Sequence, residues 1–180
     1  TSLAASEAQI VNVADELGFA VYHKADPNKN LHIEDFYIYK KEEGTGARPV
    51  VDKGIEKKST INTFGLYAKY NLAPFTFKGQ IAGQSGKYGE NDRTGVGGYF
   101  FVTRGFKSKF KPTLNAGYVY LSGNDSTTSK NEAWDPLFSR WPAFSDAYSE
   151  FYYLAYNTEG GCLGYWTNLS MPKFGLSLVP

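Results

Sequence analysis

The sequence predicts an all-β fold in which antiparallel strands follow one another as an up-and-down meander. Two observations predict it. The 180 residues include 14 Tyr, 13 Phe and 19 Gly but only one Met, and aromatic residues favour strands while glycine favours the turns between them. Apolar and polar residues also alternate with a period of two along much of the chain, which is typical of strands with two different faces.

The first strands are expected at residues 17–24 and 31–41, joined as a hairpin by the turn-forming segment 26–30. The preceding residues, 1–16, fit either a short helix or the end of a strand. A charged, glycine-containing segment at 40–59 is the next expected loop.

The clearest alternation lies between residues 63 and 70, where Phe64, Leu66, Ala68 and Tyr70 share one face. After a turn at 71–74, a second alternating segment at 75–84 completes another hairpin. The glycine-rich, charged stretch 85–92 predicts a loop.

A further strand is predicted from Arg93 to Arg104, followed by a basic turn at 106–111 and a strand at 113–120. The glycines between Gly95 and Gly98 fall inside a strand, where glycine marks close packing, strong curvature or space for a neighbouring aromatic ring. Strands are also expected downstream, at 148–156, 163–169 and 174–179.

These segments amount to roughly eight strands, and no linker divides residues 1–180 into more than one domain. Residues 122–147 contain two Trp, two Pro and charges of both signs. Such a tract is too polar to cross lipid and too rich in aromatic anchors for a passive linker. We expect it to be a long structured loop.

The same pattern predicts how the protein meets a membrane. Mean hydropathy is −0.41 and no apolar run reaches the 18 or so residues of a membrane helix. Barrel strands remain compatible, since half of their residues face a wet lumen. Short turns alternating with a long loop are typical of outer-membrane barrels. The expected fold is therefore an antiparallel up-and-down transmembrane β-barrel in contact with outer-membrane lipid.

The composition argues against most chemistry. A net charge of +1 gives no basic stripe for nucleic acid. Cys162 is the only cysteine, and His23 and His32 are too few for a convincing metal site, so no metal and no cofactor are expected. Neither Ser122 nor Ser139 has a histidine near it in sequence, and we do not expect an enzyme.

Several segments resemble the alginate export family of outer-membrane proteins. The most specific are Tyr118–Asp125, Asp135–Pro142 and Gly164–Leu169, with a similar strand and loop rhythm at Phe75–Gln80 and Gly86–Gly89. The resemblance implies a large barrel in the outer membrane of a Gram-negative bacterium, of which this chain forms part. It also implies a porin-like channel whose water-filled lumen passes a polysaccharide or another polar solute.

Lumen-facing cations follow from the strand pattern. If Phe64 and Leu66 face lipid, Lys69 and Lys78 face inward, because a lysine at mid-membrane on the lipid face costs about 2 to 4 kcal/mol. A carrier of acidic polysaccharide would use such cations as weak, multiple contacts. The solute-binding candidates are Lys69, Lys78, Arg93, Arg104 and Arg140.

Other readings of these residues stay open. The cations also fit a role in hydrating the lumen or pairing with carboxylates, and Arg140 fits an ion pair with Asp135, Asp146 or Glu150 that pins the loop. The aromatic residues expected at the membrane interfaces are Tyr99, Tyr118, Tyr120, Tyr152, Tyr156 and Trp166. A porin for small polar solutes, a soluble carbohydrate-binding β-sandwich and a structural outer-membrane barrel without transport are the alternatives.

Overall fold

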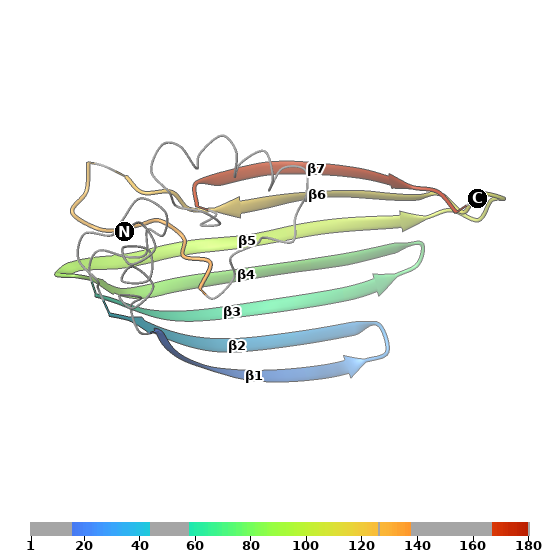
Figure 1. The fold of residues 1–180 in the computed structure, drawn as a ribbon. Helices are drawn as coiled ribbons and strands as arrows, with labels where there is room; N and C mark the ends of the chain where they lie inside the picture. Colours follow the sequence, from blue (N-terminus) through green and yellow to red (C-terminus); the bar gives the residue numbers. More distant parts are fainter. Residues whose placement is uncertain (1–15, 44–57, 126, 138–166, 180) are drawn as a thin grey trace, which may run out of the picture.

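Seven antiparallel strands form one open sheet in the computed structural model, which describes residues 16–43, 58–125, 127–137 and 167–179. Each strand pairs with the next in sequence, and the predicted meander is confirmed (Figure 1). Within the described residues the sheet does not close, so β1 and β7 each pair with one neighbour. The strands are β1 (Glu16–Asn28), β2 (Leu31–Glu42), β3 (Ser59–Leu72), β4 (Phe75–Tyr88), β5 (Asn91–Gly105), β6 (Thr113–Leu121) and β7 (Leu169–Ser177).

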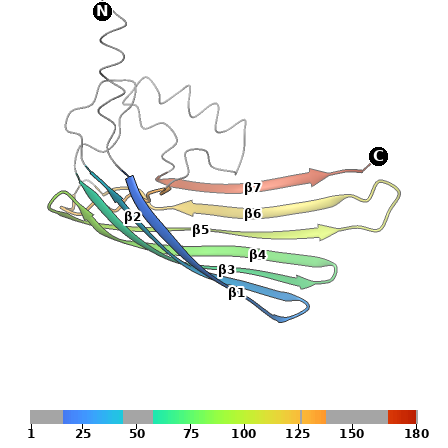
Figure 2. The same ribbon diagram turned by 60° about the horizontal axis from the view of Figure 1, so that its bottom comes forward.

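The sheet is twisted, so that β1 crosses the direction of β7 obliquely (Figure 2). Its three turns at one end are short and connect β1 to β2, β3 to β4 and β5 to β6. None of the described residues belongs to a helix long and apolar enough to cross a membrane.

The prediction of a loop over residues 85–92 is wrong. Strand β4 continues to Tyr88 and β5 begins at Asn91, which leaves Gly89 and Glu90 as the turn. Gly89 has a φ of 61°, a left-handed conformation that glycine adopts without steric cost. Glycine and charged residues suggested a loop, but Lys87 and Asp92 form a cross-strand ion pair of 2.5 Å instead.

The strand predicted at 174–179 is confirmed over residues 174–177, but it begins earlier than expected, because β7 runs from Leu169 to Ser177. Of the strand predicted at 163–169, residues 163–166 lie outside the described residues, and 167–168 are not in a strand. Pro172 lies inside β7, opposite Tyr118 of β6. Proline lacks the N–H of the ladder and is tolerated in a strand that pairs on one side. The strand predicted at 148–156 lies outside the described residues.

Cross-strand register divides the sheet into two faces, because directly paired residues point to the same side. We call one the open face. Among the described strands, every exposed large hydrophobic side chain except Tyr22 lies on it. These side chains are Leu17, Phe19, Val21, Phe64, Leu66, Tyr70, Leu72, Ile81, Val96, Phe100, Leu114, Tyr118, Tyr120, Phe174 and Leu176.

The opposite, covered face carries the core. Phe101, Val119, Leu121 and Leu169 are buried there, and Trp134 packs against them. Trp134 belongs to a covering segment, residues 122–125 and 127–137, that leaves β6 and folds back over this face. The sheet is therefore covered on one side and bare on the other.

Two glycines explain how bulky rings fit on the covered face. A Cβ at Gly97 would lie 2.8 Å from the Trp134 ring, so the expectation of space for an aromatic ring is confirmed. At Gly117 a Cβ would overlap the Phe101 ring and lie 2.6 Å from the Phe100 carbonyl oxygen. The second contact is with backbone, which cannot give way without distorting the sheet.

We predict that Gly117→Ala destabilises the folded protein by about 1 to 3 kcal/mol, the usual cost of forcing an extra methyl into a packed site. Urea unfolding would measure it. The matched control is Gly83→Ala on the open face of β4, where no atom lies within 4 Å of the new Cβ. A Gly117→Ala protein as stable as the control would contradict the packing seen at Phe101.

Candidate functional site

The covering segment is fixed to the sheet through Asp135, which is 2% exposed. Its Oδ2 accepts a hydrogen bond of 2.8 Å from an Arg93 guanidinium nitrogen of β5. The other terminal nitrogen of Arg93 donates to Ser59 Oγ of β3 at 2.9 Å. Lys40 Nζ of β2 lies 3.8 Å from Asp135 Oδ1. One buried carboxylate thus faces two cations from different strands.

The backbone around Asp135 is held as firmly as its side chain. The Asp135 N–H donates to Gln84 Oε1 at 2.8 Å, and Gln84 Nε2 donates to the Asp135 carbonyl at 2.7 Å. The amide of Gln84 therefore pairs with the segment as a neighbouring strand would. Lys40 Nζ donates to the Leu137 carbonyl at 2.8 Å and pairs with Glu42 at 2.7 Å.

A turn at the start of the covering segment is held by local hydrogen bonds. Asp125 Oδ1 accepts from the Thr127 backbone N–H at 2.8 Å and from its hydroxyl at 2.7 Å. The hydroxyl and then the backbone donor stabilise the carboxylate and lower the pKa of Asp125. The turn is therefore built for an ionised aspartate.

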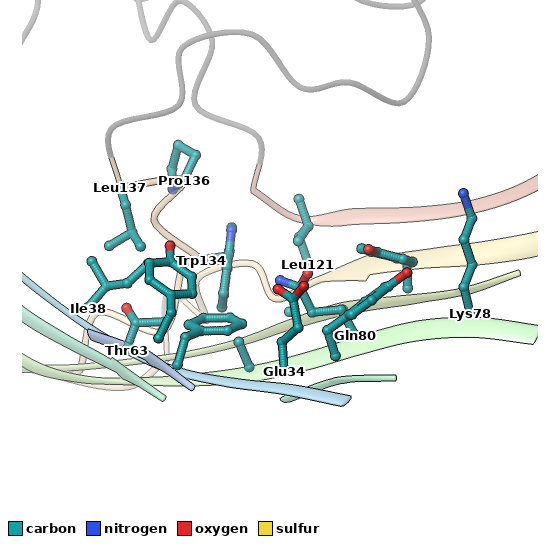
Figure 3. Close-up of a pocket in the computed structure, with 16 residues that line it drawn as sticks. Glu34, Ile38, Thr63, Lys78, Gln80, Leu121, Trp134, Pro136 and Leu137 are labelled. Carbon is teal, nitrogen blue, oxygen red and sulfur yellow. The ribbon is translucent and has the colours of Figure 1, made fainter. Parts of the chain in front are cut away.

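A hollow of about 630 Å³ lies beside the covering segment on the covered face. Trp134, Pro136 and Leu137 stand at one side of it, and Glu34 and Gln80 rise from the sheet between them and Lys78 (Figure 3). Aromatic rings supply much of the remaining lining, from Tyr22, Phe36, Tyr67 and Tyr99. Such a lining suits a polar solute with apolar patches, of which a sugar ring is one example.

A row of cations crosses the same face nearer the short turns. Lys69 of β3 lies directly opposite Lys78 of β4, and His32 and Lys173 share their row through the register of β2 and β7. His32 hydrogen-bonds to Asp26 at 2.7 Å and to Glu34 at 2.8 Å.

Lys69 and Lys78 are different, because no described carboxylate lies within ion-pair distance of either amine. Lys78 Nζ lies 5.4 Å from the centre of the Phe101 ring. Like charges placed directly opposite each other on a sheet destabilise it. An anion bound between the two lysines would remove that repulsion, so this pair is suited to hold one.

The structure separates the predicted cations. Lys69 and Lys78 lie on the covered face, whereas Phe64 and Leu66 lie on the open face, as expected from the alternation. Arg93 lies there too, but it is buried against Asp135 and anchors the covering segment. Arg104 lies on the open face, beside the rings of Phe75 and Phe106. Arg140 lies outside the described residues, and Asp135 pairs with Arg93 and Lys40.

The predicted interface aromatics divide in the same way. Tyr118 and Tyr120 lie on the open face, 45% and 47% exposed. Tyr99 lies on the covered face, where it packs against the buried core and its ring centre is 5.6 Å from that of Phe101. Tyr99 therefore does not share a face with the other two. Tyr152, Tyr156 and Trp166 lie outside the described residues.

The two histidines do not form a common site. His23 hydrogen-bonds to Asp35 at 2.8 Å on the open face, whereas His32 and Glu34 lie on the covered face. In the part of the chain that the structure describes, no three His, Cys, Asp or Glu side chains are grouped to hold a metal ion.

Sequence reasoning missed Lys40, Ser59 and Gln84 as parts of the anchor. Strand alternation does place Thr63 and Gln84 on one face, but nothing local points to Asp135, which is 51 residues from Gln84. The Asp135-Pro136 step was the available signal, because it marks a rigid turn in a polar tract.

Comparisons of the chain with protein-family models, with curated proteins and with solved structures found no match. They therefore give the resemblance to the alginate export family no support, and that resemblance stays a prediction from the sequence. What the structure itself defines is a curved, two-faced antiparallel sheet with an anchored covering segment.

We predict that Asp135→Asn destabilises the protein by about 3 kcal/mol, since removing one partner of a buried ion pair leaves the other charge uncompensated. Urea unfolding and protease cleavage within residues 122–137 would both report it.

The control is Asp92→Asn, the same change in the exposed pair with Lys87, both of whose side chains are 59% exposed. Ion pairs that are this exposed contribute little to stability, so this variant should be nearly as stable as the parent. Equal stability of the two variants would mean that Asp135 does not hold the covering segment.

Proposed function

We propose that this chain forms part of the wall of a transmembrane β-barrel in the outer membrane, acting as a porin-like channel for polar or anionic solutes. The open face meets lipid and the covered face lines a water-filled lumen. The observation that carries the proposal is the open face itself, on which six of the seven described strands, all except β2, leave large hydrophobic side chains exposed. Soluble monomers rarely expose contiguous apolar patches beyond a few hundred Å².

The boundary of the open face supports the proposal further. On the loop side of the open face, the first polar residue beyond Tyr39 on β2 is Lys41, and the first beyond Pro172 on β7 is Ser170. The pair of His23 and Asp35 also lies on this face, nearer the short turns. Traced through the register to β5, Lys41 and Ser170 correspond to Asp92 and Gly98. Between β2 and β7, which are five strand spacings apart, the apolar boundary is therefore displaced by six residues along the strand direction.

This displacement corresponds to a definite strand tilt. With about 3.3 Å per residue along a strand and about 4.8 Å between strands, it gives a tilt of about 40° to the plane of the boundary. Closed barrels have strands tilted by roughly 35 to 45°. A flat membrane edge crossing tilted strands explains the slant, whereas a second sheet packed on the open face would not require it.

On the lumen side, the covering segment would narrow the channel, because Asp135 holds it against the wall. Solute would then pass the hollow and the lysine pair. Passage needs contacts that are favourable but weak and multiple, which exposed lysines provide better than a buried site. The choice of an acidic polysaccharide as the solute rests on the resemblance to the alginate export family. The seven strands need further strands to complete a barrel.

Neighbouring residues of β4 test which face meets lipid. In a Cys162→Ser background, we predict that a fluorophore on Ile81→Cys is quenched by nitroxide-labelled lipid and little by aqueous iodide. A fluorophore on Gln80→Cys should show the opposite, because Ile81 lies on the open face and Gln80 lines the hollow.

This pair is its own control, since the two positions are adjacent and differ in face alone. Quenching of both positions by iodide, in a protein that stays soluble without detergent, would exclude the membrane wall. The soluble carbohydrate-binding β-sandwich would then be the better-supported hypothesis.

Conductance in planar bilayers tests transport. We predict anion-selective pores, and a roughly twofold or larger fall in the anion-to-cation permeability ratio in the Lys69→Gln/Lys78→Gln double variant, because the lumen then loses two positive charges. The reversal potential in a salt gradient measures the ratio.

The control variant is Lys87→Gln, which removes the same charge from the same strand as Lys78 but on the open face. It should leave the selectivity unchanged. Well-inserted protein with no conductance would contradict the channel and leave a structural barrel.

A further inference from the structure

The hairpin of β5 and β6 has an unusual charge distribution. Between Arg93 and Asn124 the chain contains no Asp or Glu, yet Arg104, Lys107, Lys109 and Lys111 cluster at the turn. All four side chains belong to exposed residues. In the described part of the protein, no carboxylate pairs with any of them. The turn therefore presents four uncompensated positive charges at the short-turn end of the sheet.

The turn is ordered rather than a loose basic tail. Its ends are joined by a hydrogen bond of 2.9 Å from the Phe106 N–H to the Pro112 carbonyl, and Lys111 N–H donates to the Ser108 carbonyl at 3.0 Å. A hollow of about 640 Å³ lies within it, lined in part by Phe106, Lys107 and Lys111.

Aromatic rings sit directly beside these cations. The Arg104 guanidinium lies 4.7 Å from the centre of the Phe106 ring and 5.2 Å from that of Phe75. Lys109 Nζ lies 5.5 Å from the centre of the Phe110 ring, which belongs to a residue that is 50% exposed. Aromatic and basic side chains in contact are typical of the zone where apolar lipid meets headgroups.

An apolar groove begins at Arg104 and continues along the open face. Its volume is about 490 Å³. Ala116 has the smallest side chain in its row on the open face, between Val102 on β5 and Phe174 on β7, which leaves the surface hollowed there. The groove is lined mainly by Phe75, Val102, Leu114, Ala116, Phe174 and Leu176, with Arg104 at its rim.

We propose that the β5–β6 hairpin holds one anionic phospholipid, with an acyl chain in the groove and the phosphate headgroup at Arg104 and the lysines of the turn. This inference rests on the proposed function, in which the open face meets lipid. Guanidinium groups bind phosphate oxygens in a bidentate manner, and the lysines add point charges around it. Free phosphate would use the basic turn alone, whereas only a lipid also explains the adjoining apolar groove.

Photo-crosslinking of the full protein in phosphatidylcholine vesicles tests the site. The vesicles carry a small fraction of phosphatidylglycerol with a photoreactive group in its acyl chain, or the same phosphatidylcholine analogue. We expect adducts on Leu114, Phe174 and Leu176 with the phosphatidylglycerol probe. They should fall about tenfold in the Arg104→Gln/Lys107→Gln variant, given what each basic residue contributes near an anionic headgroup.

Two further variants separate headgroup from chain. Lys29→Gln removes a charge from the turn between β1 and β2, at the same end of the sheet but separated from the site by the β3–β4 turn, and it should leave the adducts unchanged. Ala116→Leu keeps every cation but fills the groove, and it should abolish adducts on Phe174.

Equal labelling by the two probes, or labelling spread evenly over the open face, would overturn the lipid site while the membrane wall stands. Loss of labelling on adding excess inorganic phosphate would also overturn it in favour of a phosphate site. Failure of the protein to insert, reported by iodide quenching at Ile81→Cys, would overturn both the lipid site and the proposed function.

Discussion

The buried ion pair between Asp135 and Arg93 is the interaction on which the arrangement of the covered face depends. It draws a polar segment onto the sheet and places Trp134 over Gly97, where the ring completes the small core around Phe101. Buried charges need partners and hydrogen bonds to repay their desolvation. Gln84 adds two hydrogen bonds of its amide to the N–H and carbonyl of Asp135, so the backbone of the segment is fixed as well as its carboxylate.

The second constraint is the strict alternation of the strands. A shift of one residue in any pairing would turn Leu66 and Ile81 to the covered face and Tyr67 and Gln80 to the open one. Register is strongly specified when one face excludes water and the other carries anchored polar groups. Here the ion pair of Asp135 and the lipid-facing side chains of the proposed wall favour the same register, each from its own side.

Local pattern was sufficient for the first six described strands, apart from the facing ends of β4 and β5, and for Lys69 and Lys78, because alternation with Phe64 and Leu66 assigns their face directly. The prediction of function failed where it relied on residue type, aromatic or basic, and did not use the position of the residue in the strand alternation. Tyr99 and Arg104 are five residues apart on one strand, so they must point to opposite faces, and the structure places Arg104 on the open one. The anchor at Asp135 was beyond local pattern, since it joins residues 42 apart, and Arg93 became a structural cation through a partner that no strand period predicts.

Positive charge is used in three physically distinct ways along one hairpin and its neighbours. Arg93 is buried and its charge is neutralised by the carboxylate of Asp135. Lys69 and Lys78 are opposed on the covered face without a described carboxylate, which leaves their charge available to a solute. Arg104 lies among aromatic rings at the edge of the open face, where a guanidinium keeps its long stem in apolar surroundings and its head at the water boundary. Net charge near zero conceals this division, and only the face and burial of each cation separate the anchoring role of Arg93 from the proposed contacts with solute and lipid.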